Sequence, residues 1–281
     1  MGVLIDAHHH LWDVSKGYAW LDDPALAPLR RSFSVTDLRA ELSANGVDYT
    51  ILVEAGRCAP AEVEEFLNIA GGTPEIAAVV GWCDVTSPRL PSSPLLVGAR
   101  DQIQGQPDPD FLARQDVHSG LRTLAERGLV FDLVIRPDQL PAAAAAARAI
   151  PELTFVLDHL GKPPLRSGDL GPWRSALERL ALQPNVYAKL SGLVTEAAWD
   201  SWTVADLVPP VDAALGLFGA DRLMFGSDWP VCLLAASYRD VKASVDETLA
   251  QLSAAEREQI FSGTAIRAYG LSGLLGAAGS P

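Results

Sequence analysis

The chain has 281 residues, of which 48% are hydrophobic and 20% are charged, a composition that is normal for a folded globular protein. Its 35 acidic and 22 basic residues give a formal net charge of −13, which repels nucleic acid and anionic membranes. No run approaches the roughly 20 apolar residues of a membrane helix, and the N-terminus lacks the pattern of a signal peptide. Together with three scattered cysteines and no CxxC pair, these features predict a cytoplasmic protein that binds neither nucleic acid nor membranes.

Eight strand-like apolar runs recur along the chain, separated by segments with helical periodicity. Most runs are continuous rather than alternating, as expected when both faces of a parallel sheet are buried. They cover residues 3–7, 49–53, 76–82, 95–99, 129–135, 153–157, 186–190 and 222–225. This pattern predicts an α/β protein with a single (β/α)₈ TIM barrel over residues 1–272 and a flexible tail over residues 273–281. A doubly wound open sheet is the alternative, and it is disfavoured because no glycine-rich phosphate loop follows the first run.

Two polar or irregular segments are too long for a minimal barrel, residues 11–33 and residues 101–117. Each follows a predicted strand, and long loops in that position usually form the substrate mouth of a barrel. A third segment, residues 87–94, carries three prolines but precedes a strand, which is typical of a simple connector.

Three consecutive histidines follow the first apolar run, His8, His9 and His10. Side chains alternate along a strand, so His8 and His10 are expected on one face and His9 on the other. Two imidazoles projecting together from the end of the first barrel strand are typical of a metal site or a proton-transfer site. His9 is interpreted as structural.

Two further titratable residues stand at predicted strand ends, His159 and Asp228. Because a barrel closes on itself, the end of the eighth strand lies beside the first, and Asp228 is therefore expected to face His8 and His10. A carboxylate beside two imidazoles can ligate a divalent cation or deprotonate water. The alternative for Asp228 is a helix N-cap, which Pro230 disfavours.

Several charged residues lie at or just beyond other strand ends, where they can line the mouth: Glu54, Arg57, Arg100, Arg136 and Lys189. Any one of these is as readily a salt-bridge partner as a substrate ligand. The three arginines together indicate some capacity to bind an anionic or oxygen-rich molecule. His118 lies in a polar connection and is interpreted as solvated.

Three motifs in combination resemble the amidohydrolase superfamily, in its "amidohydrolase 2" branch. They are His8-x-His10, His159-Leu-Gly-Lys-Pro163 and Phe225-Gly-Ser-Asp-Trp-Pro230. Finer matches at residues 5–13, 80–85, 131–137 and 186–192 are similar to the sugar-lactonase group, typified by L-fuconolactonase and L-rhamnonolactonase. The resemblance extends from about residue 3 to residue 271, and its specificity lies in the ensemble of motifs.

The resemblance implies hydrolysis of a small lactone, with Asp228 and His159 as catalytic residues. It implies at most one divalent metal, zinc, at His8, His10 and Asp228, although pyrone-dicarboxylate hydrolases of the same branch work without metal. The substrate-binding residues expected on this basis are Arg100, Arg136, Lys189, Trp12 and Trp229. Asp228 would take a proton from water and return it to the leaving ring oxygen. The sequence leaves open whether the chains form a homo-oligomer.

Three alternatives remain at this stage. The first is a hydrolase of a pyrone dicarboxylate or a muconolactone, and the second is a metal-dependent decarboxylase of the same superfamily. The third is a non-catalytic binding protein that kept the barrel but lost activity, which the intact His/Asp set disfavours. The chain also departs from its relatives near the expected pocket, because Asp101 stands where they tend to have histidine and Glu54 where many have glutamine. These departures leave the particular lactone undetermined.

Overall fold

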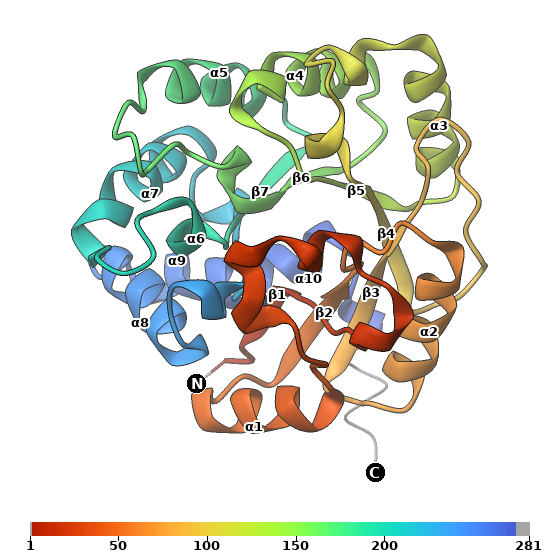
Figure 1. Ribbon diagram of the computed structural model, residues 1–281. Helices are drawn as coiled ribbons and strands as arrows, with labels where there is room; N and C mark the ends of the chain where they lie inside the picture. Colours follow the sequence, from red (N-terminus) through yellow and green to blue (C-terminus); the bar gives the residue numbers. More distant parts are fainter. Residues whose placement is uncertain (1, 274–281) are drawn as a thin grey trace.

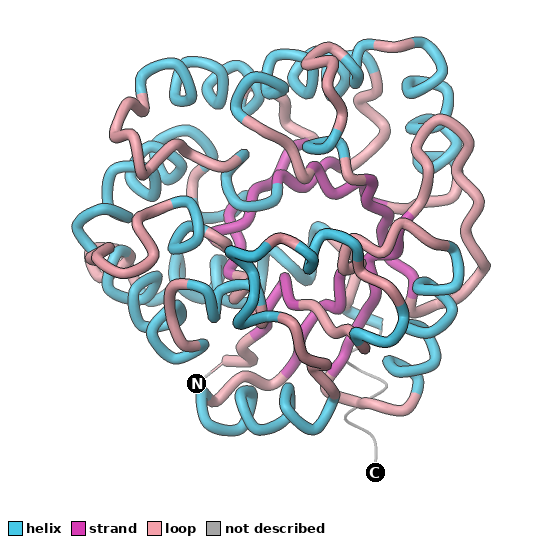
Figure 2. Tube along the Cα trace, viewed as in Figure 1, coloured by secondary structure: helices cyan, strands magenta, loops and turns pink. Residues whose placement is uncertain are grey.

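The computed structural model describes residues 2–273 and forms one eight-stranded parallel barrel (Figures 1 and 2). The strands follow one another in sequence order, which confirms the predicted TIM barrel and excludes the doubly wound sheet. They are β1 (Ile5–His9), β2 (Tyr49–Val53), β3 (Ile76–Trp82), β4 (Leu96–Asp101), β5 (Val130–Leu133), β6 (Phe155–Leu157), β7 (Val186–Leu190) and β8 (Leu223–Phe225). The boundary predicted at residue 272 stays a prediction, because most of the predicted tail lies outside the described residues.

Helices surround the barrel, and α1, α7, α8 and α9 begin at Ser or Thr residues that cap them. Ser34, for example, accepts a hydrogen bond from the Asp37 amide in a capping box, and Gly46 ends the same helix with φ 62°. The helices are α1 (Val35–Asn45), α2 (Pro60–Gly71), α3 (Gln115–Glu126), α4 (Leu140–Ala149), α5 (Gly171–Ala181), α6 (Leu193–Glu196), α7 (Val204–Phe218), α8 (Tyr238–Thr248), α9 (Ala254–Glu258) and α10 (Thr264–Ala268). The part of the chain that the structure describes has no helix long and apolar enough to cross a membrane.

The long segment after β1 folds across the mouth of the barrel, in front of the strands in Figure 1. It contains three short 3₁₀ helices, Val14–Lys16, Ala19–Asp22 and Pro24–Leu29. Trp12 anchors it, because its indole packs edge-on against Phe33 and donates a hydrogen bond to the Arg31 carbonyl. This segment is therefore an ordered wall of the mouth.

The barrel interior is apolar below and charged above. Small and branched side chains of alternate strand residues fill the lower part, together with Tyr269 and Leu271 from the C-terminal segment. Above them lie the buried charges of Asp132, Lys189 and Asp158. The Tyr269 hydroxyl donates to both carboxylate oxygens of Asp132, at 2.8 and 2.9 Å, and so links the barrel floor to this charged layer.

The seam between β1 and β8 is held by Asp6 rather than by a regular ladder. The buried carboxylate accepts hydrogen bonds from the Ser227 amide (2.8 Å), the Ser227 hydroxyl (2.6 Å), the His8 amide (3.0 Å) and the Tyr238 hydroxyl (2.8 Å). The β1–β2 register shifts between Asp6 and His9. Such a bulge lets Asp6 face Tyr238 of α8 while His8 turns into the barrel, although the two residues would share a face in a regular strand.

We expect Asp6→Asn to lower the free energy of unfolding by about 2–4 kcal/mol. The NH₂ group of the asparagine would face some of the N–H and O–H donors that bind the Asp6 carboxylate, and two donors cannot form a hydrogen bond with each other. Tyr238→Phe removes a single donor and should cost only about 1–2 kcal/mol. Urea denaturation followed by circular dichroism measures both changes. Equal losses for the two variants would contradict a central role for the carboxylate.

Candidate active site

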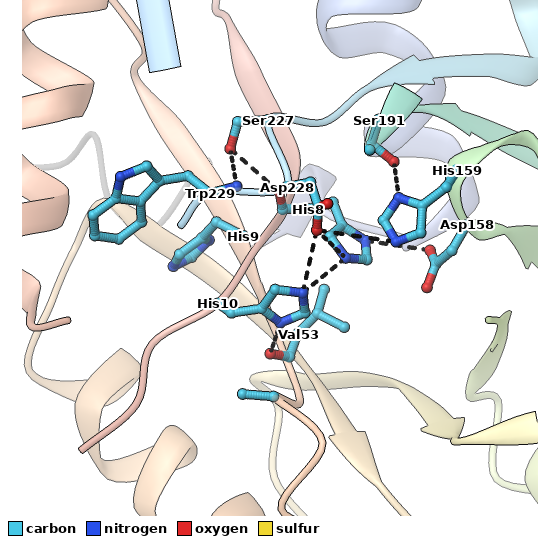
Figure 3. Close-up of polar contacts among 12 residues, drawn as sticks. His8, His9, His10, Val53, Asp158, His159, Ser191, Ser227, Asp228 and Trp229 are labelled. Carbon is cyan, nitrogen blue, oxygen red and sulfur yellow. Dashed lines mark hydrogen bonds and ion pairs between the residues drawn. The ribbon is translucent and has the colours of Figure 1, made fainter. Parts of the chain in front are cut away.

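Four side chains converge at the carboxyl ends of the strands (Figure 3). His8 Nε2 lies 3.1 Å from His10 Nε2 and 3.7 Å from Asp228 Oδ1. The same Asp228 oxygen lies 3.5 Å from His10 Nε2 and 4.0 Å from His159 Nε2. The structure thus brings together all four residues that the sequence singled out at strands one, six and eight.

Two members of this cluster, His10 and His159, are each held by a second contact. His10 Nδ1 lies 2.9 Å from the Val53 carbonyl oxygen, which can only accept, so this nitrogen carries the proton and Nε2 is left as an acceptor. His159 Nδ1 lies 2.9 Å from the Ser191 hydroxyl. His159 and Asp228 both have left-handed backbone conformations, with φ 54° and 57°. Such conformations are costly for residues other than glycine and recur at functional sites.

Two glycines permit this close packing. A Cβ atom on Gly192 would lie 2.5 Å from His159 Nδ1, and one on Gly226 would lie 2.7 Å from the His8 Cβ atom. Gly192 also has φ 62°, a conformation that side chains disfavour. The imidazoles of His8 and His159 can therefore approach only because the neighbouring strand ends lack side chains.

The donor atoms fit a single small cation. Zinc–nitrogen bonds of about 2.0–2.1 Å in tetrahedral geometry place ligand atoms about 3.3 Å apart. The separations within the cluster bracket this value, and the ligand atoms of His8, His159 and Asp228 all lie within 4.8 Å of one another. This group contains two of the predicted ligands, His8 and Asp228, together with His159, whereas the third predicted ligand, His10, lies beside it with Nε2 3.1 Å from His8 Nε2.

Burial and neighbouring groups set the protonation states of two cluster residues, His159 and Asp228. It lowers the pKa of His159 to about 4, so that this imidazole is neutral at pH 7. Burial alone would raise the pKa of Asp228, but the neighbouring His159 and His10 outweigh it and lower the pKa below its usual range. Asp228 is consequently a carboxylate at neutral pH, able to accept a proton or to hold a cation.

His9 faces away from the cluster, as strand alternation predicts. Its Nδ1 atom lies 3.0 Å from the Ile51 carbonyl oxygen and 2.5 Å from the Thr50 hydroxyl. Burial lowers its pKa to about 3, so this imidazole is a neutral packing residue.

Lys189 and Arg100 are engaged by buried carboxylates. Lys189 is fully buried beneath the cluster, with Nζ 2.6 Å from Asp132 and 2.9 Å from Asp158. Arg100 reaches the cavity wall, but it pairs with Glu54 at 2.6 Å and with Asp158 at 2.9 Å. The two cations therefore neutralise carboxylates that burial would otherwise destabilise, and Lys189 lies outside the cavity lining.

The cluster opens into a cavity of about 420 Å³. Trp20 lines it, and Trp12 lies behind Trp20 with the ring centroids 5.4 Å apart. Trp229 is buried against Phe33 and does not line the cavity. Arg136 also lies outside the lining, where its guanidinium holds the Gln104 and Gln106 carbonyls. Of the five residues predicted to bind substrate, the structure places only Arg100 in the cavity wall.

Sequence reasoning missed several polar residues that line the cavity. Their shared feature is a position within six residues of a strand end on β4, β6 or β7, which was a usable signal: Gln102, Gln104, Lys162, Thr195 and Glu196. Trp20 lines the cavity in place of the predicted Trp12 and Trp229. Loop conformation decided among those tryptophans, and the sequence does not encode it in a simple pattern.

The chain matches a known protein family over nearly its whole length. The family model described as amidohydrolase matches residues 5–271. The chain belongs to the amidohydrolase family.

Two named relatives and one solved structure illustrate the place of this amidohydrolase in the family. It is 39% identical to a Burkholderia multivorans protein named L-fucono-1,5-lactonase, over 96% of this chain and 97% of the relative. It also superposes on the crystal structure of an amidohydrolase from Burkholderia multivorans with bound zinc, with a TM-score of 0.91, 38% identity and coverage of 96% and 99%. A relative from Scheffersomyces stipitis, named L-rhamnono-gamma-lactonase, is 29% identical over 63% of this chain and 60% of the relative's length.

A buried carboxyl group lies behind the cavity wall of the amidohydrolase. Glu62, in the first turn of α2, is fully buried, and among the described residues neither of its carboxyl oxygens has a hydrogen-bond partner. Burial, together with the charge of Glu54, raises its pKa to about 8. The folded state therefore holds this proton more tightly than the unfolded state, and Glu62 favours unfolding as the pH rises from about 4.5 to 8.

Glu62→Gln removes this titration. We expect the variant to gain stability relative to the parent protein as the pH rises, by on the order of 3 kcal/mol between pH 4.5 and pH 8. Urea midpoints measured at both pH values test the expectation. Glu64→Gln, at an exposed position two residues away, is the matched control and should change little at either pH. A parallel pH dependence for Glu62→Gln and the parent protein would show that Glu62 is ionised in the fold.

Proposed function

We propose that this amidohydrolase opens the lactone ring of a small sugar acid of the L-fucono-lactone type. The observation that carries the proposal is the joint presence of near full-length similarity to an L-fucono-1,5-lactonase and a His/Asp cluster at the base of a cavity of about 420 Å³. A cavity of this size suits a monosaccharide-sized ring.

The charge of the cavity favours a neutral substrate. Both cations in its lining are paired, Arg100 with Glu54 and Asp158, and Lys162 with Glu196 at 3.5 Å. A pyrone dicarboxylate or the carboxylate of a decarboxylase substrate would need a cation that is free to bind it. The solved pyrone-dicarboxylate hydrolase and decarboxylase structures that resemble this chain are at most 22% identical to it and support the fold alone. The pairing of these cations therefore favours a polyhydroxylated neutral lactone.

One wall of the cavity is apolar. Leu26 from the segment after β1 and Val231 and Leu234 from the segment after β8 line it, and the two segments pack on each other. Such a wall suits a methyl group better than a hydroxymethyl group, because a hydroxyl buried there would lose its hydrogen bonds to water. This wall supports the lactone of a 6-deoxy sugar acid.

We assign the proton transfers to Asp228. Its carboxylate accepts a proton from water while the water oxygen attacks the lactone carbonyl carbon. The bond between that carbon and the ring oxygen then breaks, and Asp228 returns the proton to the ring oxygen, which leaves as a hydroxyl. The product is a hydroxy acid that ionises and releases one proton to solvent.

The cluster also supports a metal-assisted form of this reaction. We propose that three ligands drawn from His8, His10, His159 and Asp228 would hold the ion and leave a fourth position open to water, in line with the zinc present in the Burkholderia multivorans structure. A zinc ion held there would polarise the carbonyl and lower the pKa of the attacking water.

Asp228→Asn should reduce kcat for lactone hydrolysis by about 10²–10⁴-fold, because the amide cannot accept the proton. Proton release is followed with a pH indicator across a panel of sugar-acid lactones, with and without chelator and added zinc. Asp212→Asn, at an exposed position on α7, is the matched control and should retain full activity. Turnover close to that of the parent protein in Asp228→Asn would refute the assignment, and release of CO₂ from an aromatic acid would favour the decarboxylase.

The apolar wall predicts a preference between two lactones that differ only at C6. We expect kcat/KM for L-fucono-lactone to exceed that for L-galactono-lactone by about tenfold or more, the magnitude typical of a small group in an apolar pocket. Leu234→Ser should narrow this ratio by admitting water to the wall. Leu182→Ser, at a position that is 74% exposed, should leave it unchanged. Equal kcat/KM values in the parent protein would rule out a role of this wall in selectivity.

A further inference from the structure

The His8 imidazole has competing polar neighbours at both ring nitrogens. Nδ1 lies 3.1 Å from Lys189 Nζ, a donor, and 3.3 Å from Asp158 Oδ1, an acceptor. Nε2 lies 3.1 Å from His10 Nε2 and 3.4 Å from Arg100 Nη1. A neutral imidazole carries one proton, so His8 can satisfy only one member of each pair.

Two proton arrangements are therefore available. In the first, Lys189 donates to Nδ1 of His8, and the proton on Nε2 is donated to His10 Nε2, which is an acceptor because its own ring donates to Val53. In the second, Nδ1 donates to Asp158 and Nε2 has no proton. The second arrangement places two nitrogen lone pairs 3.1 Å apart, and their repulsion is offset only by the Arg100 guanidinium, whose Nη1 lies at the longer distance of 3.4 Å from His8 Nε2, unless a cation lies between the two nitrogens.

Lys189 is held in the position that favours the first arrangement. Its ammonium group has three donors and three neighbours, Asp132 Oδ2 at 2.6 Å, Asp158 Oδ1 at 2.9 Å and His8 Nδ1 at 3.1 Å. The hydrogen bonds from Tyr269 fix Asp132 from below, and Lys189 is fully buried. Hydrogen bonds join the ammonium to Asp132 and His8, whereas Asp158 Oδ1 is an ion-pair partner that has no hydrogen bond among the described residues, so one N–H of the ammonium is directed at the His8 ring.

We propose that Lys189 is a positioning residue that selects the His8 tautomer protonated at Nε2 and thereby weakens metal binding, whereas Asp158 selects the metal-binding tautomer. The proposal rests on His8 being a ligand in the proposed function. It assigns to this pair the balance between a hydrogen-bonded cluster and a metal-loaded one. Metal binding then requires the His8 proton to transfer from Nε2 to Nδ1, with no change in net protonation of the ring.

Nitrogen-15 NMR of the histidine rings tests the tautomer directly in the metal-free wild-type protein. The chain has only five histidines, so a His8→Gln spectrum identifies the His8 signal. We expect His8 to be protonated at Nε2 without metal and at Nδ1 after zinc is added. Protonation at Nδ1 in the metal-free protein would overturn the proposal.

Zinc dissociation constants measured by competition with a chromophoric chelator give a second test. Lys189→Gln removes the competing donor and supplies an amide oxygen able to accept from Nδ1, so we expect zinc to bind at least tenfold more tightly. Lys162→Gln removes a cation from the cavity without touching His8 and is the matched control, with a change of less than about threefold. If zinc binds more tightly by the same factor in both variants, loss of a positive charge alone explains the change, and the proposal is overturned.

The two proposals can fail separately. If neither the wild-type protein nor Lys189→Gln binds zinc, the tautomer proposal is overturned and the metal is removed from the proposed function, while lactone hydrolysis is judged by its own assay. If zinc binds as expected but no lactone is hydrolysed, the tautomer proposal stands and the proposed substrate is wrong. Loss of the fold in Lys189→Gln leaves the wild-type NMR measurement to decide.

Discussion

The closure of the barrel between β1 and β8 is the constraint on which the site depends. These two strands meet without a regular ladder, so the Asp6 carboxylate and the hydrogen bonds from the Asp228 amide to the His8 carbonyl (2.8 Å) and from the His10 amide to the Trp229 carbonyl (2.7 Å) hold them together. These contacts join residues at opposite ends of the chain. The same backbone atoms that close the barrel therefore set the distance between Asp228 and the two histidines.

Beneath the site lies a layer of paired buried charges. Isolated carboxylates in such surroundings would be protonated, because desolvation costs several kcal/mol per ion. Arg100 and Lys189 keep Asp158 ionised, and these charges lower its pKa well below the usual range despite burial. The layer comes from four different strands, so its geometry is as rigid as the barrel itself. At these fixed distances the Lys189 ammonium, a donor, and the Asp158 carboxylate, an acceptor, compete for Nδ1 of His8.

The sequence predicted the fold and the four residues of the cluster because both follow from short-range patterns. Continuous apolar runs indicated parallel strands, alternation separated His8 and His10 from His9, and closure placed Asp228 beside them. The cavity wall was beyond this reasoning, since the choice of Trp20 over Trp12 depends on how a segment of more than twenty residues folds across the mouth. The burial of Lys189 was likewise missed, because its partners Asp132 and Asp158 lie on other strands.

A column of hydrogen bonds runs along the barrel axis from the C-terminal segment to the site. It passes from the Tyr269 hydroxyl to Asp132, then to Lys189, and from Lys189 to His8. Each step joins fully buried groups, so water cannot replace a missing partner. The position of the Lys189 ammonium, and with it the balance of the His8 tautomers, therefore depends on the docking of the last described helix against the barrel floor. Closure at the seam therefore sets the positions of His8 and His10, whereas this column sets which nitrogen of His8 carries the proton.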